Sequence, residues 1–131
     1  MPPSPSAKPK SKARLVAERD GRRGEWWAAL YLRAKLYRIR AKRVKTPVGE
    51  IDLIAERFGT TVFVEVKARA FSTDEESAIY AINRRRIVRA AQYYVMRHPR
   101  LNDTDMRFDV IFLAPFAWPR HVKNAFDASG I

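Results

Sequence analysis

The chain has 131 residues, 47% of them hydrophobic, and a chain of this length is expected to form one domain around a single core. It contains no cysteine, which excludes disulfides, thiolate metal sites and a cysteine nucleophile and agrees with a cytoplasmic location. No apolar run approaches the roughly 20 residues of a membrane span, and the N-terminus lacks the apolar segment of a secretory signal, so we expect no membrane partner.

The charge is strongly unbalanced, with a formal net charge of +12 and an isoelectric point of about 10.6. An excess of this size predicts an anionic partner, and nucleic acid is the usual one. The alternative is a surface charge that only keeps the protein soluble. Three of the lysines fall in residues 1–12, so +12 − 3 leaves +9 on the rest of the chain and favours the first interpretation.

The first predicted elements are a tail and a helix. Residues 1–12 are rich in Pro, Ser and Lys, which predicts a disordered basic tail, and residues 13–131 are expected to form the single domain. A helical pattern covers residues 14–36, and the glycines at 21 and 24 are expected to break or restart it, so that 25–35 is its firm part. Its apolar stripe comprises Ala28, Ala29, Leu32 and Leu36.

A strand at 37–44 and a turn at 46–49 precede residues 49–68, GEIDLIAERFGTTVFVEVKA, whose alternation predicts a two-stranded hairpin. A helix is expected from Ser72, where Glu75 completes a capping box, to Pro99, with a kink at Asn83. Strands at 106–113 and 121–126 complete the order α, β, β, β, α, β, β. This order predicts an α/β or α+β fold with a central mixed β-sheet flanked by helices.

Charged residues interrupt both strands of the hairpin. If the loop at Phe58-Gly59 has two or four residues, three pairs face each other across the strands: Ile54 with Phe63, Asp52 with Glu65, and Glu50 with Lys67. Opposed like charges destabilise a sheet, so Asp52 and Glu65 favour a cation between them, and Mg²⁺ is the natural candidate. Two alternatives stay open: a solvated sheet face with an ordinary Glu50–Lys67 ion pair, and a three-residue loop that would put the two carboxylates on opposite faces.

Five segments of the sequence resemble the YraN family of small bacterial proteins: GEWWAALYL, GEIDLIA, VFVEVKAR, RFDVI and NAF. Their order and spacing fit that family over nearly the whole chain after residue 20. The family in turn is similar to the PD-(D/E)XK nuclease superfamily, near the archaeal Holliday-junction resolvases. The superfamily pattern, an Asp on one strand and Glu-x-Lys on the next, corresponds here to Asp52 and to Glu65-Val66-Lys67.

The resemblance implies a restriction-endonuclease-like fold and hydrolysis of phosphodiester bonds in DNA, branched or damaged, with Mg²⁺ or Mn²⁺ as cofactor. It implies that Asp52 and Glu65 hold the metal, with Glu50 in support, and that Lys67 acts on the attacking water or on the phosphate. Resolvase-like members add a glutamate from the first helix, a position that Glu25 matches. The alternative for Glu25 is a favourable interaction with the positive helix N-terminus. The resolvases are dimers, so the resemblance adds a homodimer as an option.

The sequence departs from the superfamily pattern at two places. Ile51 stands where the superfamily has a Pro before the Asp, as is normal in the YraN group. The family usually has a Lys in its second helix, where this chain has Arg84, Arg85, Arg86 and Arg89. These arginines are candidates for binding nucleic-acid phosphates, and a solvated helix face is the alternative for each of them.

Other polar and aromatic residues are interpreted as structural. Asp109 is expected to be a buried carboxylate paired with an arginine, either Arg107 or one from the helix. His98 and His121 are too far apart in sequence to predict a His-based metal site or triad. The tryptophans at 26, 27 and 118 are expected in the core or at an interface, although the one at 27 is equally suited to base stacking.

The sequence is consistent with two functions. The first is a metal-dependent endonuclease acting on DNA. The second is a nucleic-acid-binding module that keeps the nuclease fold without catalysis, and the net charge supports both equally.

Overall fold

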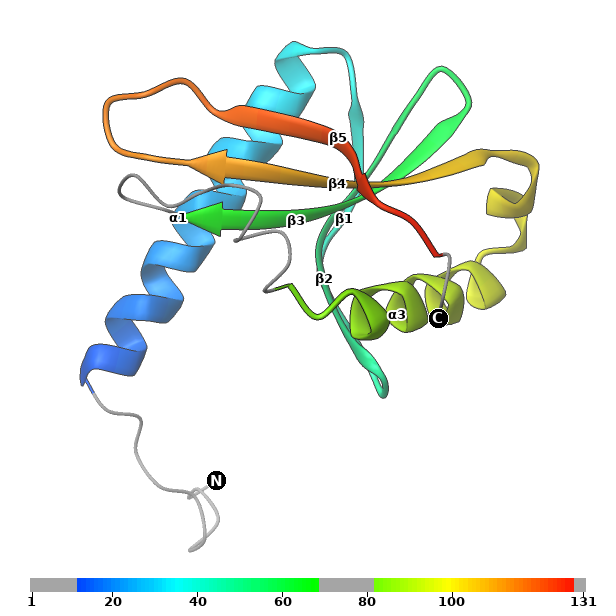
Figure 1. Ribbon diagram of the computed structural model, residues 1–131, viewed down its shortest axis with the longest axis horizontal. Helices are drawn as coiled ribbons and strands as arrows, with labels where there is room; N and C mark the ends of the chain where they lie inside the picture. Colours follow the sequence, from blue (N-terminus) through cyan, green and yellow to red (C-terminus); the bar gives the residue numbers. More distant parts are fainter. Residues whose placement is uncertain (1–11, 69–81, 129–131) are drawn as a thin grey trace, which may run out of the picture.

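The computed structural model describes residues 12–68 and 82–128, and these residues form helices and one mixed five-stranded sheet (Figure 1). The elements in chain order are α1 (Lys12–Ala34), β1 (Arg38–Thr46), β2 (Gly49–Arg57), β3 (Thr60–Ala68), α3 (Arg84–Arg97), the 3₁₀ helix η1 (Pro99–Asp103), β4 (Asp105–Leu113) and β5 (Arg120–Phe126). The expected α/β fold with a mixed sheet is confirmed. Residues 1–11 of the expected tail, and the expected helix start at Ser72 with its capping box, lie outside the described residues.

The strands are arranged in the sheet in chain order, β1-β2-β3-β4-β5. Only β3 and β4 are parallel, because the chain between them crosses the sheet through α3, whereas the other neighbours pair antiparallel. The carboxyl ends of β3 and β4 therefore lie at the same edge of the sheet, with Lys67 beside Phe112. We call this edge the carboxyl edge of β3 and β4.

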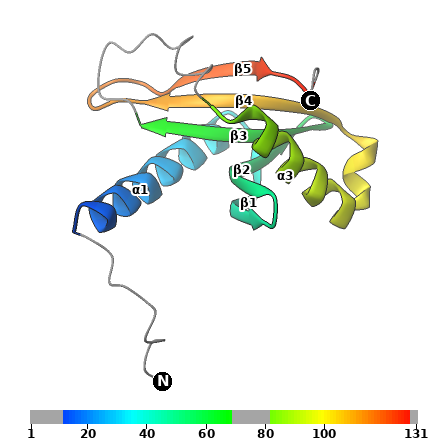
Figure 2. The ribbon, with the colours of Figure 1, turned by 60° about the horizontal axis from the view of Figure 1, so that its bottom comes forward.

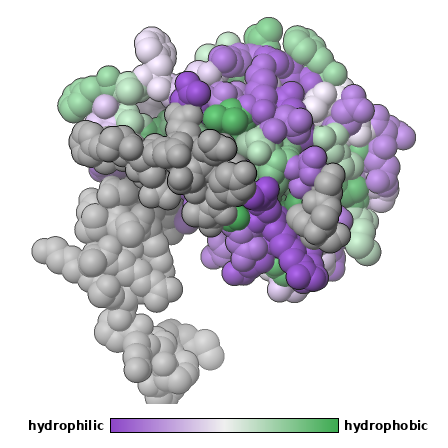
Figure 3. Space-filling model, in the orientation of Figure 1, coloured by the Kyte–Doolittle hydropathy of each residue, from purple (hydrophilic) through white to green (hydrophobic). Residues whose placement is uncertain are grey.

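Helices cover both faces of the sheet, so the molecule has two hydrophobic cores (Figure 2). Helix α1 packs Ala28, Ala29 and Leu32 onto alternate side chains of β2, β3 and β4. Helix α3 packs Ile87 and Val88 onto the opposite set. Hydrophilic side chains cover most of the outer surface in one view, and hydrophobic ones gather near the β4–β5 connection (Figure 3). In the part of the chain that is described, neither helix is long and apolar enough to cross a membrane.

Helix α1 differs from its prediction at both glycines and at its end. It runs without a break from Lys12 to Ala34, so glycines 21 and 24 do not interrupt it. Gly24 is buried and faces the side chains of Val66 and Leu113, where its lack of a side chain lets the helix approach the sheet. The helix ends in a Schellman motif, with Leu36 at φ 72° and the Tyr37 N–H donating to Leu32 O. Leu36 was therefore placed wrongly in the apolar stripe: it is 72% exposed, and Tyr37 fills the core instead.

The β2–β3 hairpin confirms the predicted register near its turn. Phe58 and Gly59 both have positive φ, at 50° and 78°, as a two-residue type I′ turn requires, and Ile54 lies opposite Phe63. Pairing stops at Leu53 and Val64, however, so the predicted pairs Asp52–Glu65 and Glu50–Lys67 are not part of the ladder. Beyond this point β2 continues to pair with β1, with Glu50 beside Lys45. The two strands thus separate at Asp52.

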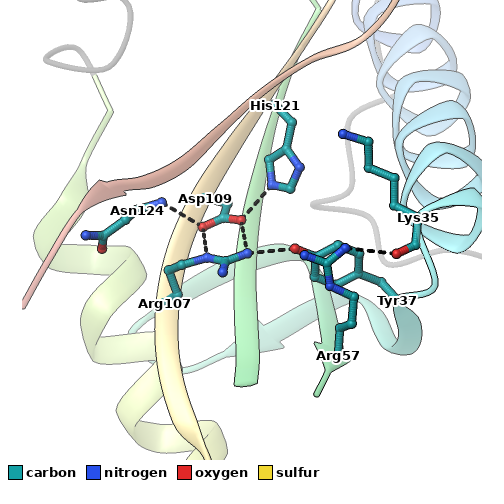
Figure 4. Close-up of polar contacts among 7 residues, drawn as sticks. All are labelled: Lys35, Tyr37, Arg57, Arg107, Asp109, His121 and Asn124. Atoms are coloured by element: carbon teal, nitrogen blue, oxygen red, sulfur yellow. Dashed lines mark hydrogen bonds and ion pairs between the residues drawn. The ribbon is translucent and has the colours of Figure 1, made fainter. Parts of the chain in front are cut away.

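The side chains of β4 alternate between the two cores as predicted, and Asp109 is completely buried. Figure 4 shows the contacts of its carboxylate. Arg107 forms a bidentate ion pair with it, at 2.8 Å from Nε to Oδ1 and 2.9 Å from Nη2 to Oδ2, so the structural interpretation is confirmed. His121 Nε2 donates to Oδ2 at 2.6 Å, and the Asn124 N–H donates to Oδ1 at 2.9 Å. Burial alone would raise the pKa of Asp109, but these donors outweigh it and lower the pKa below its ordinary value.

This cluster connects β4, β5 and the start of β1. Arg107 also donates to the Tyr37 hydroxyl at 2.8 Å, and the Arg57 guanidinium stacks on the Tyr37 ring while donating to Lys35 O (Figure 4). The C-terminus of α1 is thereby attached to the sheet through side chains of three strands. We call Tyr37, Arg107, Asp109 and His121 the structural polar cluster.

Replacing Asp109 is expected to destabilise the fold strongly. Asp109→Asn removes the buried charge that Arg107 and His121 face, and breaking such a buried ion pair should cost about 3 kcal/mol of unfolding free energy. Because the folded state lowers the pKa of Asp109, its stabilisation is present above the ordinary pKa of 3.8 and is lost as the pH falls through the folded value. Urea unfolding at pH 7 measures the effect, with Asp105→Asn, an exposed carboxylate on the same strand, as the control. An equal decrease of the unfolding free energy in both variants would contradict a stabilising role of the structural polar cluster.

Candidate functional site

A cavity of about 450 Å³ opens where β2 and β3 separate, under the N-terminus of α3. Four candidate residues from the hairpin line this cavity together with residues at the start of α3. The lining residues are Glu50, Asp52, Glu65, Lys67, Ile82, Asn83, Arg86 and Ile87. The carboxylates and the lysine thus lie on one face of the sheet, as the side-chain alternation predicted, and the structure shows that α3 covers this face.

Asp52 occupies the point at which the strands part. The Val66 N–H of β3 donates to Asp52 Oδ2 at 2.8 Å, so a side chain of β2 accepts this backbone hydrogen bond. Burial raises the pKa of Asp52, the Val66 N–H and the charge of Lys67 partly oppose the shift, and the net pKa stays above the ordinary 3.8. The Asp52 carboxylate is therefore held in place by the backbone but is not fully stabilised as an anion.

Glu65 is the more strongly perturbed of the two carboxyl groups. Burial and the nearby charge of Asp52 raise its pKa from 4.5 to about 7, against the opposing charge of Lys67. Lys67 Nζ lies 3.6 Å from Glu65 Oε1, which is an ion pair with a loose geometry. The pair is thus short of positive charge, and Lys67 compensates only part of the deficit.

The N-terminus of α3 closes the cavity from above. The predicted kink at Asn83 is wrong, because α3 begins directly after this residue. Asn83 is the N-cap, and its Oδ1 accepts the Arg86 N–H at 3.2 Å. A Cβ at Gly49 would lie 2.7 Å from Arg86 O, so only glycine lets the start of β2 pass this close under the helix. Helix N-termini carry a partial positive charge, which favours anions in this cavity.

The four arginines of α3 take different positions. Arg86 lines the cavity, while Arg85 and Arg89 are exposed on the same helix and Arg84 is half-buried. Only Arg86 is therefore placed at the cavity. The other three keep their interpretation as candidate phosphate contacts next to it.

Glu25 does not line the cavity. Its half-buried carboxylate pairs with Arg43 of β1, with 3.2 Å between Oε2 and Nε. The preceding residue, Gly24, packs against Val66, one position from Glu65, so Glu25 lies near the same end of the sheet. Its expected support of the metal stays a prediction.

The carboxylate pair fits a hard divalent cation with few protein ligands. In the described parts of the chain, no three His, Cys, Asp or Glu side chains stand close enough to bind a metal ion together. Mg²⁺ commonly takes one or two protein carboxylates and completes its shell with water and substrate phosphate. Two carboxyl groups with raised pKa, one beside the other and facing a cavity, match that ligand set.

The N-cap of α3 was not predicted from the sequence, and the tryptophans are not in the core, which was one of the two places expected for them. Asn83 was read as a kink, although an Asn directly before a helical run is a strong N-cap signal. The three tryptophans, expected in the core or at an interface, are all exposed rather than in the core. His98 stacks on Tyr94 at the end of α3, and His121 belongs to the structural polar cluster.

Removing the charge of Glu65 is expected to change how stability depends on pH. A carboxyl group whose pKa is raised by folding keeps its proton while the unfolded chain releases it, so the free energy of unfolding falls as the pH rises from 4.5 to about 7. Glu65→Gln should remove the part of this slope that Glu65 contributes and stabilise the metal-free protein at pH 8, by at most about 3 kcal/mol, while the smaller contribution of Asp52 remains. Urea unfolding between pH 5 and pH 8 in a chelator measures it, beside the control Asp105→Asn. The same slope in Glu65→Gln as in the wild type would contradict the assignment.

Comparison with known proteins identifies the family. Residues 24–113 match the family described as Uncharacterised protein family UPF0102. A UPF0102 protein of Rhodopseudomonas palustris strain BisA53 is 46% identical over 97% of this chain and 95% of its own length. One from Bradyrhizobium sp. strain ORS 278 is 50% identical over 94% and 87%, and one from Parvibaculum lavamentivorans is 45% identical over 86% and 84%. The chain therefore belongs to the UPF0102 family, which is the YraN family that its motifs resemble.

Proposed function

We propose that this protein is a metal-dependent endonuclease that hydrolyses phosphodiester bonds in DNA on a restriction-endonuclease-like fold. One observation carries the proposal: Asp52, Glu65 and Lys67, the residues of the PD-(D/E)XK pattern, line a single cavity, and the carboxylate pair is short of positive charge. A purely structural carboxylate in the same sheet, Asp109, has a lowered pKa because donors surround it. The contrast favours a ligand at Asp52 and Glu65.

The residues of the cavity have distinct roles in this proposal. Asp52 and Glu65 would hold Mg²⁺ or Mn²⁺, which when bound supplies a Lewis acid for the phosphate and a water of lowered pKa. Lys67, on the same strand face as Glu65, would donate to a non-bridging phosphate oxygen or orient the attacking water. Glu50 is exposed at the rim of the cavity, where it would bind water rather than phosphate.

DNA is the proposed substrate because cations surround the cavity. Arg86 lines it and would form charge-assisted hydrogen bonds to a phosphate beside the scissile one. Arg85 and Arg89 are exposed on the same helix and add further phosphate contacts. With the formal charge of +12, these residues would give tight, salt-dependent binding that does not depend on base sequence.

The central test separates catalysis from binding. Asp52→Asn keeps the size of the side chain and removes a metal ligand, so it should reduce cleavage of labelled duplex, single-stranded and branched DNA by roughly 100-fold or more. Loss of one negative charge should leave DNA affinity unchanged or slightly higher. Calorimetry with Mn²⁺ should show binding to the wild type and none to Asp52→Asn, whereas the control Asp105→Asn, which has the same charge change, should behave as wild type.

The alternative is a non-catalytic module that binds nucleic acid through the same surface. Wild-type protein that binds DNA but cleaves none of the three substrates with Mg²⁺ or Mn²⁺ would establish this alternative and refute the endonuclease. In either case Arg86→Ala should weaken DNA binding and reduce the slope of log affinity against log salt by about 0.9. An unchanged slope would remove Arg86 from the DNA-binding surface.

A further inference from the structure

A second and larger cavity, of about 690 Å³, lies on the α1 side of the sheet, between α1 and the β4–β5 connection at residues 114–119. Its volume falls in the range of roughly 300–1,000 Å³ that is usual for ligand sites. Aromatic and aliphatic side chains of both segments line it, chiefly Trp27, Leu30, Tyr31, Pro115, Phe116 and Trp118. We call these residues the aromatic groove.

The aromatic rings of this groove are unusually open to solvent. Trp118 is 90% exposed, Phe116 is fully exposed and Trp27 is 56% exposed. Hydrophobic side chains visibly gather at this end of the molecule, near the β4–β5 connection (Figure 3). Contiguous exposed apolar surface is rare on monomeric proteins unless it binds something, so an occupant is expected.

The charges around the groove indicate what the occupant is. Lys35 Nζ lies 4.7 Å from the centre of the Tyr31 ring, Arg23 adjoins Gly24 of the lining, and Arg120 follows Pro119. Among the side chains that the structure describes, no carboxylate lines the groove, and Glu25, which follows Gly24 of the lining, pairs with Arg43. The described surface thus combines flat apolar rings with nearby cations, which complements an anionic polymer that carries flat rings.

The aromatic groove lies near the same edge of the sheet as the candidate site. The β4–β5 connection leaves the sheet at the carboxyl edge of β3 and β4, where Lys67 and Phe112 lie side by side. Gly24, which lines the groove, packs against Val66 and Leu113 at this same edge. The cavity with Asp52 and the aromatic groove therefore lie on opposite faces of the sheet, both near this edge.

We propose that the aromatic groove stacks unpaired nucleobases of the substrate, which makes single-stranded or unpaired DNA next to the cleaved bond the preferred substrate. This inference rests on DNA as the proposed substrate, but not on cleavage. A second copy of the chain is the less favourable occupant because it would bring together two chains that each carry a formal charge of +12.

The direct test uses Trp118 as its own probe in metal-free buffer. The chain has three tryptophans, so the double variant Trp26→Phe/Trp27→Phe leaves Trp118 as the only one. Titration with a (dT)₁₂ oligonucleotide should quench its fluorescence in a saturable manner, because a stacked base contacts the indole. A blunt duplex of equal length should bind with little quenching. Absence of quenching by (dT)₁₂ at concentrations where fluorescence anisotropy shows it bound would overturn the inference.

An affinity comparison tests the same contact without relying on fluorescence. Trp118→Ala should weaken (dT)₁₂ binding about tenfold and leave duplex binding within about twofold. The control is Phe58→Asn, which removes a similarly exposed aromatic ring at the β2–β3 turn. Asn is chosen because it tolerates the positive φ of this position. Circular dichroism shows that each variant is folded. The inference would be overturned if Trp118→Ala lost equal affinity for (dT)₁₂ and duplex, or if both variants lost equal affinity for (dT)₁₂.

Two further outcomes distinguish this inference from the proposed function. A wild-type dimer that Trp118→Ala dissociates in sedimentation equilibrium would assign the groove to a second copy and overturn base stacking. Unchanged (dT)₁₂ affinity in Trp118→Ala, together with cleavage that depends on Asp52, would overturn the inference alone and leave the endonuclease intact. Stacking observed without cleavage would refute the endonuclease alone.

Discussion

The hydrogen bond from the Val66 N–H to the Asp52 carboxylate ends the β2–β3 ladder and opens the sheet. Two antiparallel strands would normally continue to exchange backbone hydrogen bonds, and their side chains would fill the face between them. Here a side chain takes the place of a backbone acceptor, β2 continues with β1, and a cavity appears under α3. Gly49 makes this geometry sterically accessible because its missing Cβ leaves room for Arg86 O.

The sheet contains two carboxylate environments, one buried at Asp109 and one half-buried at Asp52 and Glu65, and their contrast separates structure from function. Asp109 receives donors from Arg107, His121 and Asn124, and its pKa is lowered although it is completely buried. Asp52 and Glu65 face each other with one backbone N–H and one loosely placed lysine, and the pKa of each is raised. A fold gains stability by satisfying a buried anion, so a pair that remains unsatisfied and faces a cavity is consistent with a ligand supplied from outside.

Both proposed contacts with DNA depend on the parallel pairing of β3 and β4. Parallel strands bring their carboxyl ends to one edge, so the Glu65–Lys67 strand end and the start of the β4–β5 connection are neighbours although they lie more than 40 residues apart in sequence, as the pairing of Lys67 with Phe112 shows. Helix α3 adds Arg86 to one face of this edge, and α1 adds Trp27 to the other. Contacts to the DNA backbone on the α3 face would supply most of the affinity, and base stacking on the α1 face would supply the preference for unpaired strands.

The sequence by itself determined the local and periodic features: the order of elements, the Phe58-Gly59 turn with Ile54 opposite Phe63, a common sheet face for Asp52, Glu65 and Lys67, and a buried Asp109 paired with an arginine. These follow from strand alternation and turn chemistry, which act over a few residues. Only the tertiary structure decided where β2 leaves β3, that Glu25 faces Arg43, that Leu36 gives way to Tyr37 in the core, and that the tryptophans are exposed. Each of these depends on which distant segments pack together, and a residue's sequence neighbours carry no information about the partner that packing brings to it.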